Sequence, residues 1–221
     1  MWFPLKNRMK NGRINVIITK KGGTVRLEQK RKIKVSFNSP VILGFSLICL
    51  MVFLLGLVTG HLTDTMFFSV YRSSISNPFT YVRLIGHVFG HANWEHFIGN
   101  ISLLLVLGPL LEEKYGSLNM VMVMVVTAVV TGLAFILLFP GAALCGASGV
   151  VFALILMSSF ACFREGTIPL TFILVAVIYV GGQIINGIFK VDNVSNFTHI
   201  IGGIVGAVMG YALYRLKTRK K

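Results

Sequence analysis

Residues 118–163 read LNMVMVMVVTAVVTGLAFILLFPGAALCGASGVVFALILMSSFACF and carry no charged side chain. An α-helix needs about 20 residues to cross the hydrocarbon core of a bilayer. These 46 residues are therefore long enough for two crossings. The dipeptide Pro140-Gly141 lies near the middle of the stretch, and such a pair is typical of a turn. We therefore expect two membrane-spanning helices with a break at Pro140.

Four more uncharged stretches flank this one, at residues 41–60, 96–111, 167–189 and 193–214. The second of the resulting helices is expected to begin near Asn93 or Trp94. Of all residues, 55% are hydrophobic and 13% are charged, and the mean hydropathy is +0.79. An ordinary soluble domain carries about 25% charged residues, so a soluble enzyme is excluded. The sequence predicts an all-α polytopic membrane protein, a bundle of six transmembrane helices.

Basic residues gather at both ends of the chain. Eleven of the 21 lysines and arginines lie within the first 40 residues, and five more lie in residues 215–221. Basic segments beside membrane spans stay on the cytoplasmic side, and six crossings return the chain to the side where it started. We therefore expect an integral protein of a bacterial plasma membrane, with both termini in the cytoplasm.

This charge pattern divides the chain into three parts. Residues 1–40 form a basic cytoplasmic segment, residues 41–214 the membrane domain, and residues 215–221 a basic cytoplasmic tail. The first segment is either a small cytoplasmic element or a basic tail. It lacks a zinc, helix-turn-helix or aromatic-stacking signature, so its charge indicates anionic lipid rather than nucleic acid.

Four residues stand out among those in the predicted spans, because strongly polar side chains are costly there and are candidates for function. They are His96, Asn100, Ser148 and His199. The spans that hold them all run from the outer to the inner side, and each residue lies near the start of its span. The topology therefore brings all four to one level in the outer half of the membrane.

Ser148 begins a short span, because the uncharged stretch from Ser148 to Phe163 has only 16 residues before the charge at Arg164. At about 1.5 Å per residue, this helix should start below the outer surface. Residues 140–146 must then be non-helical at membrane depth, which requires burial in protein or a water-filled cavity. A helix N-terminus also favours negative charge. Taken alone, however, Ser148 is better explained as a simple helix cap.

His199 precedes a series of glycines that allow close helix packing, namely Gly202, Gly203, Gly206 and Gly210. Offsets of +4, +7 and +11 place three of them on the face of His199. Gly149 and Ala153 form a matching stripe beside Ser148, so a Ser148–His199 hydrogen bond follows from the packing of the two helices. Spans four to six contain no acidic residue, which predicts a catalytic Ser–His dyad rather than a triad. An isolated structural histidine is the alternative.

Two pairs of polar residues, His96 with Asn100 and His87 with His91, have helical i, i+4 spacing. His96 and Asn100 lie one above the other, suited to donate hydrogen bonds to an oxyanion beside the Ser148 backbone N–H. Interhelical polar contacts are the alternative for both. His87 and His91 resemble a zinc motif, but Val88 stands where a metalloprotease needs glutamate. We therefore expect no metal, and hydrogen bonds that anchor the loop instead.

Together these pieces resemble the rhomboid family of intramembrane serine proteases over about residues 41–214. The resemblance implies a six-helix core, Ser148 as nucleophile, His199 as general base, and an oxyanion site of His96, Asn100 and the Ser148 N–H. It also implies a first outer loop partly in the outer leaflet and a substrate gate at about residues 171–193. The matching motifs are His87-x3-His91-x4-His96-x3-Asn100, Gly146-Ala147-Ser148-Gly149 and His199-x2-Gly202-x3-Gly206.

Three positions depart from the family pattern. Val82-Arg83 stands where a Trp-Arg pair is common, Phe152 where a tyrosine commonly stacks on the catalytic histidine, and Thr198 where alanine is usual. A phenylalanine can still stack on the imidazole but cannot donate a hydrogen bond. No departure removes a predicted catalytic group.

The resemblance predicts an endopeptidase that cleaves single-span membrane proteins near the outer membrane face, in the lipid bilayer and without a cofactor. The alternative is a noncatalytic rhomboid-like protein that binds membrane proteins in quality control, a class usually marked by loss of the serine or histidine. A transporter would show intramembrane charge or repeated broken helices, and neither is seen in the sequence.

Overall fold

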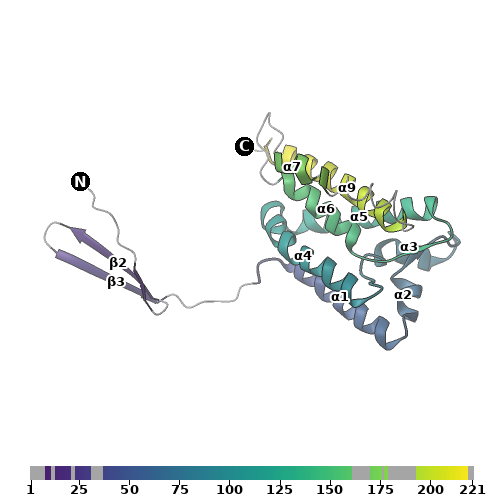
Figure 1. Ribbon diagram of the computed structural model, residues 1–221, viewed down its shortest axis with the longest axis horizontal. Coiled ribbons are helices and arrows are strands. Elements are labelled where there is room, and N and C mark those ends of the chain that lie inside the picture. The colour runs from purple at the N-terminus through teal and green to yellow at the C-terminus, as the bar shows by residue number, and fades with distance from the viewer. Residues whose placement is uncertain are drawn as a thin grey trace. The chain divides into compact units, whose positions relative to one another are not determined.

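The computed structural model describes residues 8–10, 13–20, 23–30, 37–160, 170–175, 177–178 and 193–218. The chain divides into two units, Met1–Phe37 and Asn38–Lys221 (Figure 1). The first unit is a three-stranded antiparallel sheet in the order β1-β2-β3, with bounds β1 Arg8–Lys10, β2 Arg13–Lys20 and β3 Gly23–Lys30. Val16 pairs with Leu27 and Ile18 with Val25. The all-α prediction is wrong for this unit, although the alternating apolar residues of β2 are the usual signal of a strand.

The second unit is mostly helical, and four of its described helices are long and apolar enough to cross a membrane. They are α1 (Pro40–Val58), α4 (Trp94–Tyr115), α5 (Ser117–Leu138) and residues 196–217 of α9 (Asn193–Thr218). The other described helices are α2 (Leu62–Phe67), α3 (Pro78–Gly86), α6 (Ser148–Ser159) and α7 (Leu170–Val175). The predicted fifth span, residues 167–189, lies largely outside the described residues, so the count of six remains a prediction.

Two helices extend beyond their predicted ends. α4 continues four residues past Leu111 to Tyr115, and α9 continues four residues past Tyr214 to Thr218. The predictions stopped at the first charged residue, whereas a helix can carry charge once it leaves the hydrocarbon core. The break around Pro140 is confirmed, because α5 ends at Leu138 and α6 begins at Ser148.

The charged residue that ended the second predicted span is itself structural. Glu112 is buried, and its two carboxylate oxygens accept hydrogen bonds from the backbone N–H groups of Val41 (3.1 Å) and Ile42 (3.0 Å). The Ser117 hydroxyl donates to the same carboxylate at 2.7 Å. The first N–H groups of a helix lack partners within it, and a carboxylate there is favoured. Glu112 therefore joins the start of α1 to the end of α4 and the start of α5.

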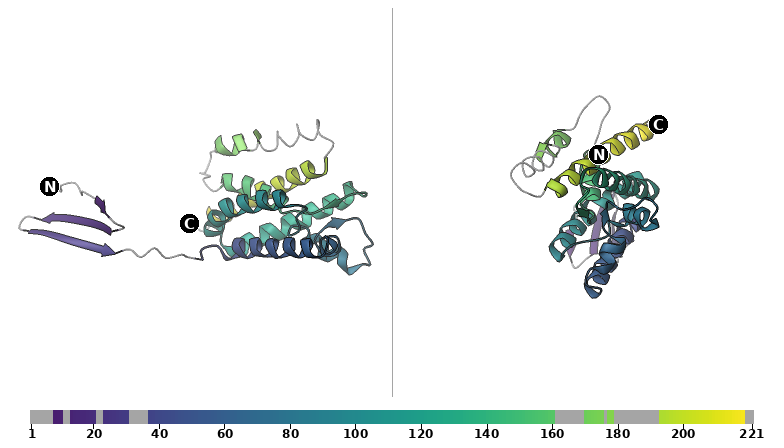
Figure 2. Two further views of the ribbon diagram at one scale, coloured as in Figure 1. Left: turned by 60° about the horizontal axis from the view of Figure 1, so that its bottom comes forward. Right: turned by 90° about the vertical axis from the view of Figure 1, so that its right-hand side faces the viewer.

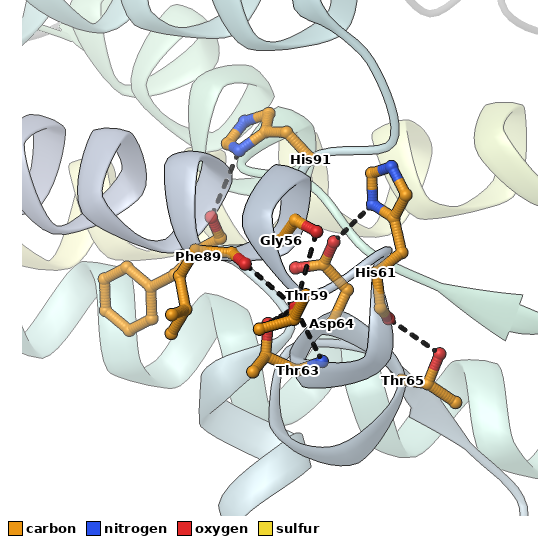
Figure 3. A network of polar contacts seen from close by, with 9 residues as sticks. Gly56, Thr59, His61, Thr63, Asp64, Thr65, Phe89 and His91 are labelled. Carbon is orange, nitrogen blue, oxygen red and sulfur yellow. Dashed lines mark hydrogen bonds and ion pairs between the residues drawn. The ribbon is translucent and has the colours of Figure 1, made fainter.

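The loop between α1 and α4 is ordered by polar contacts. Arg83 of α3 is buried and donates to the Tyr71 hydroxyl and the Ser73 hydroxyl, each at 2.9 Å. Where α1 ends, His61 Nδ1 and Asp64 Oδ2 lie 2.7 Å apart (Figure 3). These contacts fix the path of a segment that the sequence shows only as a long, aromatic-rich loop.

This loop is also joined to the segment that precedes α6. Strand β4 (Val70–Tyr71) pairs antiparallel with β5 (Ala143–Leu144), and Val70 lies opposite Leu144. The region between α5 and α6 is therefore non-helical, as predicted, and its backbone is paired with protein.

Helix α6 lies against α9 and α5 within the bundle (Figures 1 and 2). Its residues are buried on almost every side, including Val150, Leu154 and Met157. The large hydrophobic core that these residues enter also receives Ile42 of α1 and Leu104 of α4. A polar residue on α6 is consequently surrounded by protein rather than lipid.

Candidate active site

Ser148 is the first residue of α6 and is half-buried. Two residues earlier, Gly146 has φ +137°, a backbone conformation that favours glycine. The Gly146 N–H donates to the His87 carbonyl at 2.8 Å. A Cβ at this position would lie 2.8 Å from Nε2 of His96, so only a glycine lets that imidazole approach the backbone before Ser148.

His96 lies in the first turn of α4. Asn93 caps this helix, because its Oδ1 accepts a hydrogen bond from the His96 backbone N–H at 2.8 Å. The half-buried His96 ring also meets the His91 ring edge-on, with centroids 5.2 Å apart. Both contacts orient the imidazole toward Gly146. The helix cap and the glycine therefore act together to place His96 beside the N-terminal end of α6.

Asn100 follows His96 by one helical turn and is 7% exposed. Within the described residues, its Nδ2 atom is buried without a hydrogen-bond partner. Buried amide groups are nearly always paired, so an unpaired one calls for an explanation. A donor in this state can donate a hydrogen bond to an oxygen of a ligand without first breaking an existing bond.

His199 of α9 lies parallel to the ring of Phe152, with centroids 4.3 Å apart and an interplanar angle of 5°. Phe152 follows Ser148 by four residues and so lies on the same face of α6. The resemblance left stacking open to a phenylalanine at this position, and Phe152 does stack on His199. It brings the imidazole of His199 to the helix face that carries Ser148.

Small residues permit this approach of α9 to α6. A Cβ on Gly202 would lie 2.8 Å from the carbonyl carbon of Gly149, and one on Gly206 would collide with the backbone of Ala153. The predicted stripe is confirmed at Gly206 and Gly210, whereas Gly202, at offset +3, was not part of it. Gly203 differs, because a Cβ there would meet Leu156 at an ordinary 3.5 Å. In the first turn after His199, the close approach to α6 therefore lies at offset +3, not at the predicted +4.

His87 and His91 make the loop-anchoring contacts predicted for them. His87 Nδ1 lies 3.2 Å from the Arg83 carbonyl and its Nε2 lies 3.5 Å from the Thr131 hydroxyl. His91 Nδ1 lies 3.1 Å from the Phe89 carbonyl (Figure 3). Burial lowers the pKa of His87 to about 4, and burial together with the nearby His96 lowers the pKa of His91 to about 4. Both rings are thus neutral near pH 7.

The structure places the predicted site residues on three helices around the start of α6. His96 contacts Gly146 before Ser148, and His199 contacts Phe152 after it. Asn100 extends the site along α4. The sequence indicated Gly146 only as part of the motif Gly146-Ala147-Ser148-Gly149. In the structure, the absence of a Cβ at this residue is what allows His96 to approach. A glycine two positions before a helix-starting serine is the signal for it.

The fold and the site define a class: an integral, mostly helical membrane protein with a serine at the start of one helix and a histidine on the adjoining helix. A family model described as the Rhomboid domain matches residues 78–216 of the chain. The chain belongs to the rhomboid family.

Similar proteins carry the name Rhomboid protease GlpG. That of Yersinia pestis (strain Pestoides F) is 28% identical over 178 residues, covering 78% of this chain and 62% of the relative. That of Haemophilus influenzae is 25% identical over 186 residues, covering 81% of this chain and 94% of the relative. The chain therefore spans less than two thirds of the length of the Yersinia protein.

Proposed function

We propose that this protein is an intramembrane serine protease in which Ser148 is the nucleophile and His199 the general base. The observation that carries the proposal is the stacking of His199 on Phe152, one turn from Ser148 on the same face of α6. Membership of the rhomboid family and the protease names of its relatives support it.

In the proposed reaction, the His199 imidazole removes the Ser148 hydroxyl proton as Oγ attacks the substrate carbonyl carbon. The peptide C–N bond then breaks, and His199 returns the proton to the leaving amine. Water hydrolyses the resulting acyl-enzyme by the same proton transfers, which releases the acid and restores the serine. The chemistry needs no cofactor, because the imidazole serves as both base and acid.

The negative charge on the substrate oxygen requires nearby donors. We assign this role to His96, the Asn100 side chain and the Ser148 backbone N–H. The Nδ2 of Asn100, which is buried and has no partner among the residues that the structure describes, supports the assignment, because a preorganised donor costs no rearrangement during the reaction. The α6 N-terminus adds its positive dipole end.

The proposed substrates are single-span membrane proteins, cut near the outer face of a bacterial plasma membrane while both termini of the protease remain in the cytoplasm. The excess of basic residues at the chain ends supports this orientation. The predicted gate at residues 171–193 lies mostly outside the described residues and remains a prediction.

The test is cleavage of a tagged single-span reporter, co-expressed with the wild type, Ser148→Ala, His199→Ala or Ser158→Ala. Ser158 is a matched control, because its hydroxyl bonds the Ile155 carbonyl of its own helix. We expect the wild type and Ser158→Ala to release the outer fragment and the other two variants to release none. Equal fluorophosphonate labelling of wild type and Ser148→Ala would overturn the nucleophile. Expression without cleavage or labelling in any form would indicate the noncatalytic alternative.

A further inference from the structure

A cavity lies far from Ser148, where α4 and α9 end and α5 begins. Its volume is about 300 Å³, and it is lined by Lys114, Tyr115, Asn119, Leu213, Leu216 and Lys217. Along α4 the 18 residues between His96 and Lys114 correspond to about 27 Å at 1.5 Å per residue. The cavity is thus at the opposite end of the bundle from the candidate active site, and the proposed mechanism does not use it.

Two lysines are held at the wall of this cavity. The Lys217 ammonium donates to the backbone carbonyl of Lys114 at 2.8 Å, and Lys114 Nζ lies 5.3 Å from the centre of the Tyr115 ring. An ammonium group has three donors, so the carbonyl occupies one donor of Lys217. Within the described part of the chain, the charged residues that line the cavity are both lysines, and neither Glu112, which binds the start of α1, nor Glu113 lines it. The cavity therefore has a positive lining.

The remaining lining residues fit the boundary between headgroups and hydrocarbon. Leu213 and Leu216 provide an apolar side, while Asn119 provides a polar one, with its amide nitrogen donating to the Tyr115 carbonyl at 2.7 Å. The sequence from 215 to 221 adds further basic residues at this end of the chain. Basic pockets between transmembrane helices on the cytoplasmic side are suited to acidic lipid headgroups.

We propose that this cavity binds a phosphate ester, supplied by an anionic phospholipid whose headgroup lies between Lys114 and Lys217. The two ammonium groups would bind the phosphate, Asn119 and Tyr115 would contact the polar part of the headgroup, and the leucines would contact the start of an acyl chain. This site is independent of the proposed protease activity, because it lies at the other end of the helices.

The test is lipid binding by the purified full-length chain in detergent, measured by native mass spectrometry during titration with phosphatidylglycerol or phosphatidylcholine. Each lysine near an anionic surface contributes about a fivefold gain in affinity. We therefore expect Lys114→Gln/Lys217→Gln to bind phosphatidylglycerol at least tenfold more weakly than the wild type. Lys114→Arg/Lys217→Arg keeps both charges and should retain the preference for the anionic lipid.

The matched control is Arg72→Gln/Arg215→Gln, which removes the same charge from exposed positions that do not line the cavity. Equal loss of binding in this control and in the lysine-to-glutamine variant would overturn the site. Competition by inorganic phosphate, with no added affinity for the lipid, would identify a soluble phosphate ester as the ligand of the same site. Thermal unfolding without lipid checks that each variant is folded, and fluorophosphonate labelling of Ser148 reports separately on the protease proposal.

Discussion

Substituting Gly202 by alanine should separate the proposed catalytic pair without altering either member. The new Cβ would lie 2.8 Å from the Gly149 carbonyl carbon and 2.9 Å from its Cα, with the carbonyl oxygen closer still. Backbone atoms cannot rotate away as the end of a side chain can. Ordinary contact begins near 3.4 Å, so α9 has to move away from α6 by at least about 0.6 Å and carry His199 with it.

A displacement of about 1 Å in a catalytic geometry can reduce the rate about a hundredfold, and overpacking of this kind destabilises a protein by about 1–3 kcal/mol. We therefore expect Gly202→Ala to cleave the reporter about a hundredfold more slowly than the wild type and to unfold at a lower temperature. The assays are initial cleavage rate, fluorophosphonate labelling rate and thermal unfolding in detergent.

Gly203→Ala is the matched control for this experiment. It adds the same methyl group one position along the same helix, where the Cβ meets Leu156 at 3.5 Å. It also replaces glycine by a better helix former, a gain of about 1 kcal/mol. This variant should keep wild-type activity and unfold at or above the wild-type temperature. The reasoning is refuted if Gly202→Ala cleaves within a fewfold of the wild-type rate, or if both variants lose activity equally.

Three further predictions concern other parts of the molecule. Glu112→Gln should lower stability by about 1–3 kcal/mol by weakening the hydrogen bonds to the start of α1; exposed Glu113→Gln is the control, and equal unfolding temperatures would contradict this role. Phe152→Ala should reduce the cleavage rate by removing the ring that orients His199, whereas Phe152→Tyr should retain it; unchanged rates in both would exclude a positioning role. The pKa of His87 is about 4 in the folded chain and about 6.5 when unfolded, so stability should fall as pH drops from about 6.5 to 4, by up to about 1.4 kcal/mol per pH unit. Thermal unfolding against pH tests this, and His87→Asn should make the dependence shallower without removing it, because the pKa of His91 is lowered in the same way.

Local sequence features predicted much of the membrane unit. The uncharged stretches located α1, α4, α5 and α9, and the short distance from Ser148 to the next charge predicted a short α6. The C-terminal end of α4 was missed because Glu112 was treated as a boundary. The partners of Glu112, the N–H groups at the start of α1, are about 70 residues away in sequence. No local pattern reveals such a partner.

The candidate site shows the same division between local and long-range information. Helical spacing placed Gly206 and Gly210 beside α6 and put His96 and Asn100 on one face, because these relations depend only on residue separation. The stacking of His199 on Phe152 and the contact of His96 with Gly146 depend on how separate helices pack. The sheet of residues 8–30 was missed because charge dominated the interpretation of a segment that also alternates apolar and polar residues.

The pairing of β4 with β5 bears on how this protein tolerates changes in length. Leu144 is fixed opposite Val70, and Gly146 is held by the His87 carbonyl, so only a few residues separate anchored backbone from the start of α6. One residue added between Leu144 and Ser148 would turn the following helix by about 100° or shift the strand register and reverse its faces. Residues 74–76, in contrast, form an exposed segment between Ser73, which bonds Arg83, and Asn77, which caps α3. Insertions and deletions should therefore accumulate there and be absent just before Ser148.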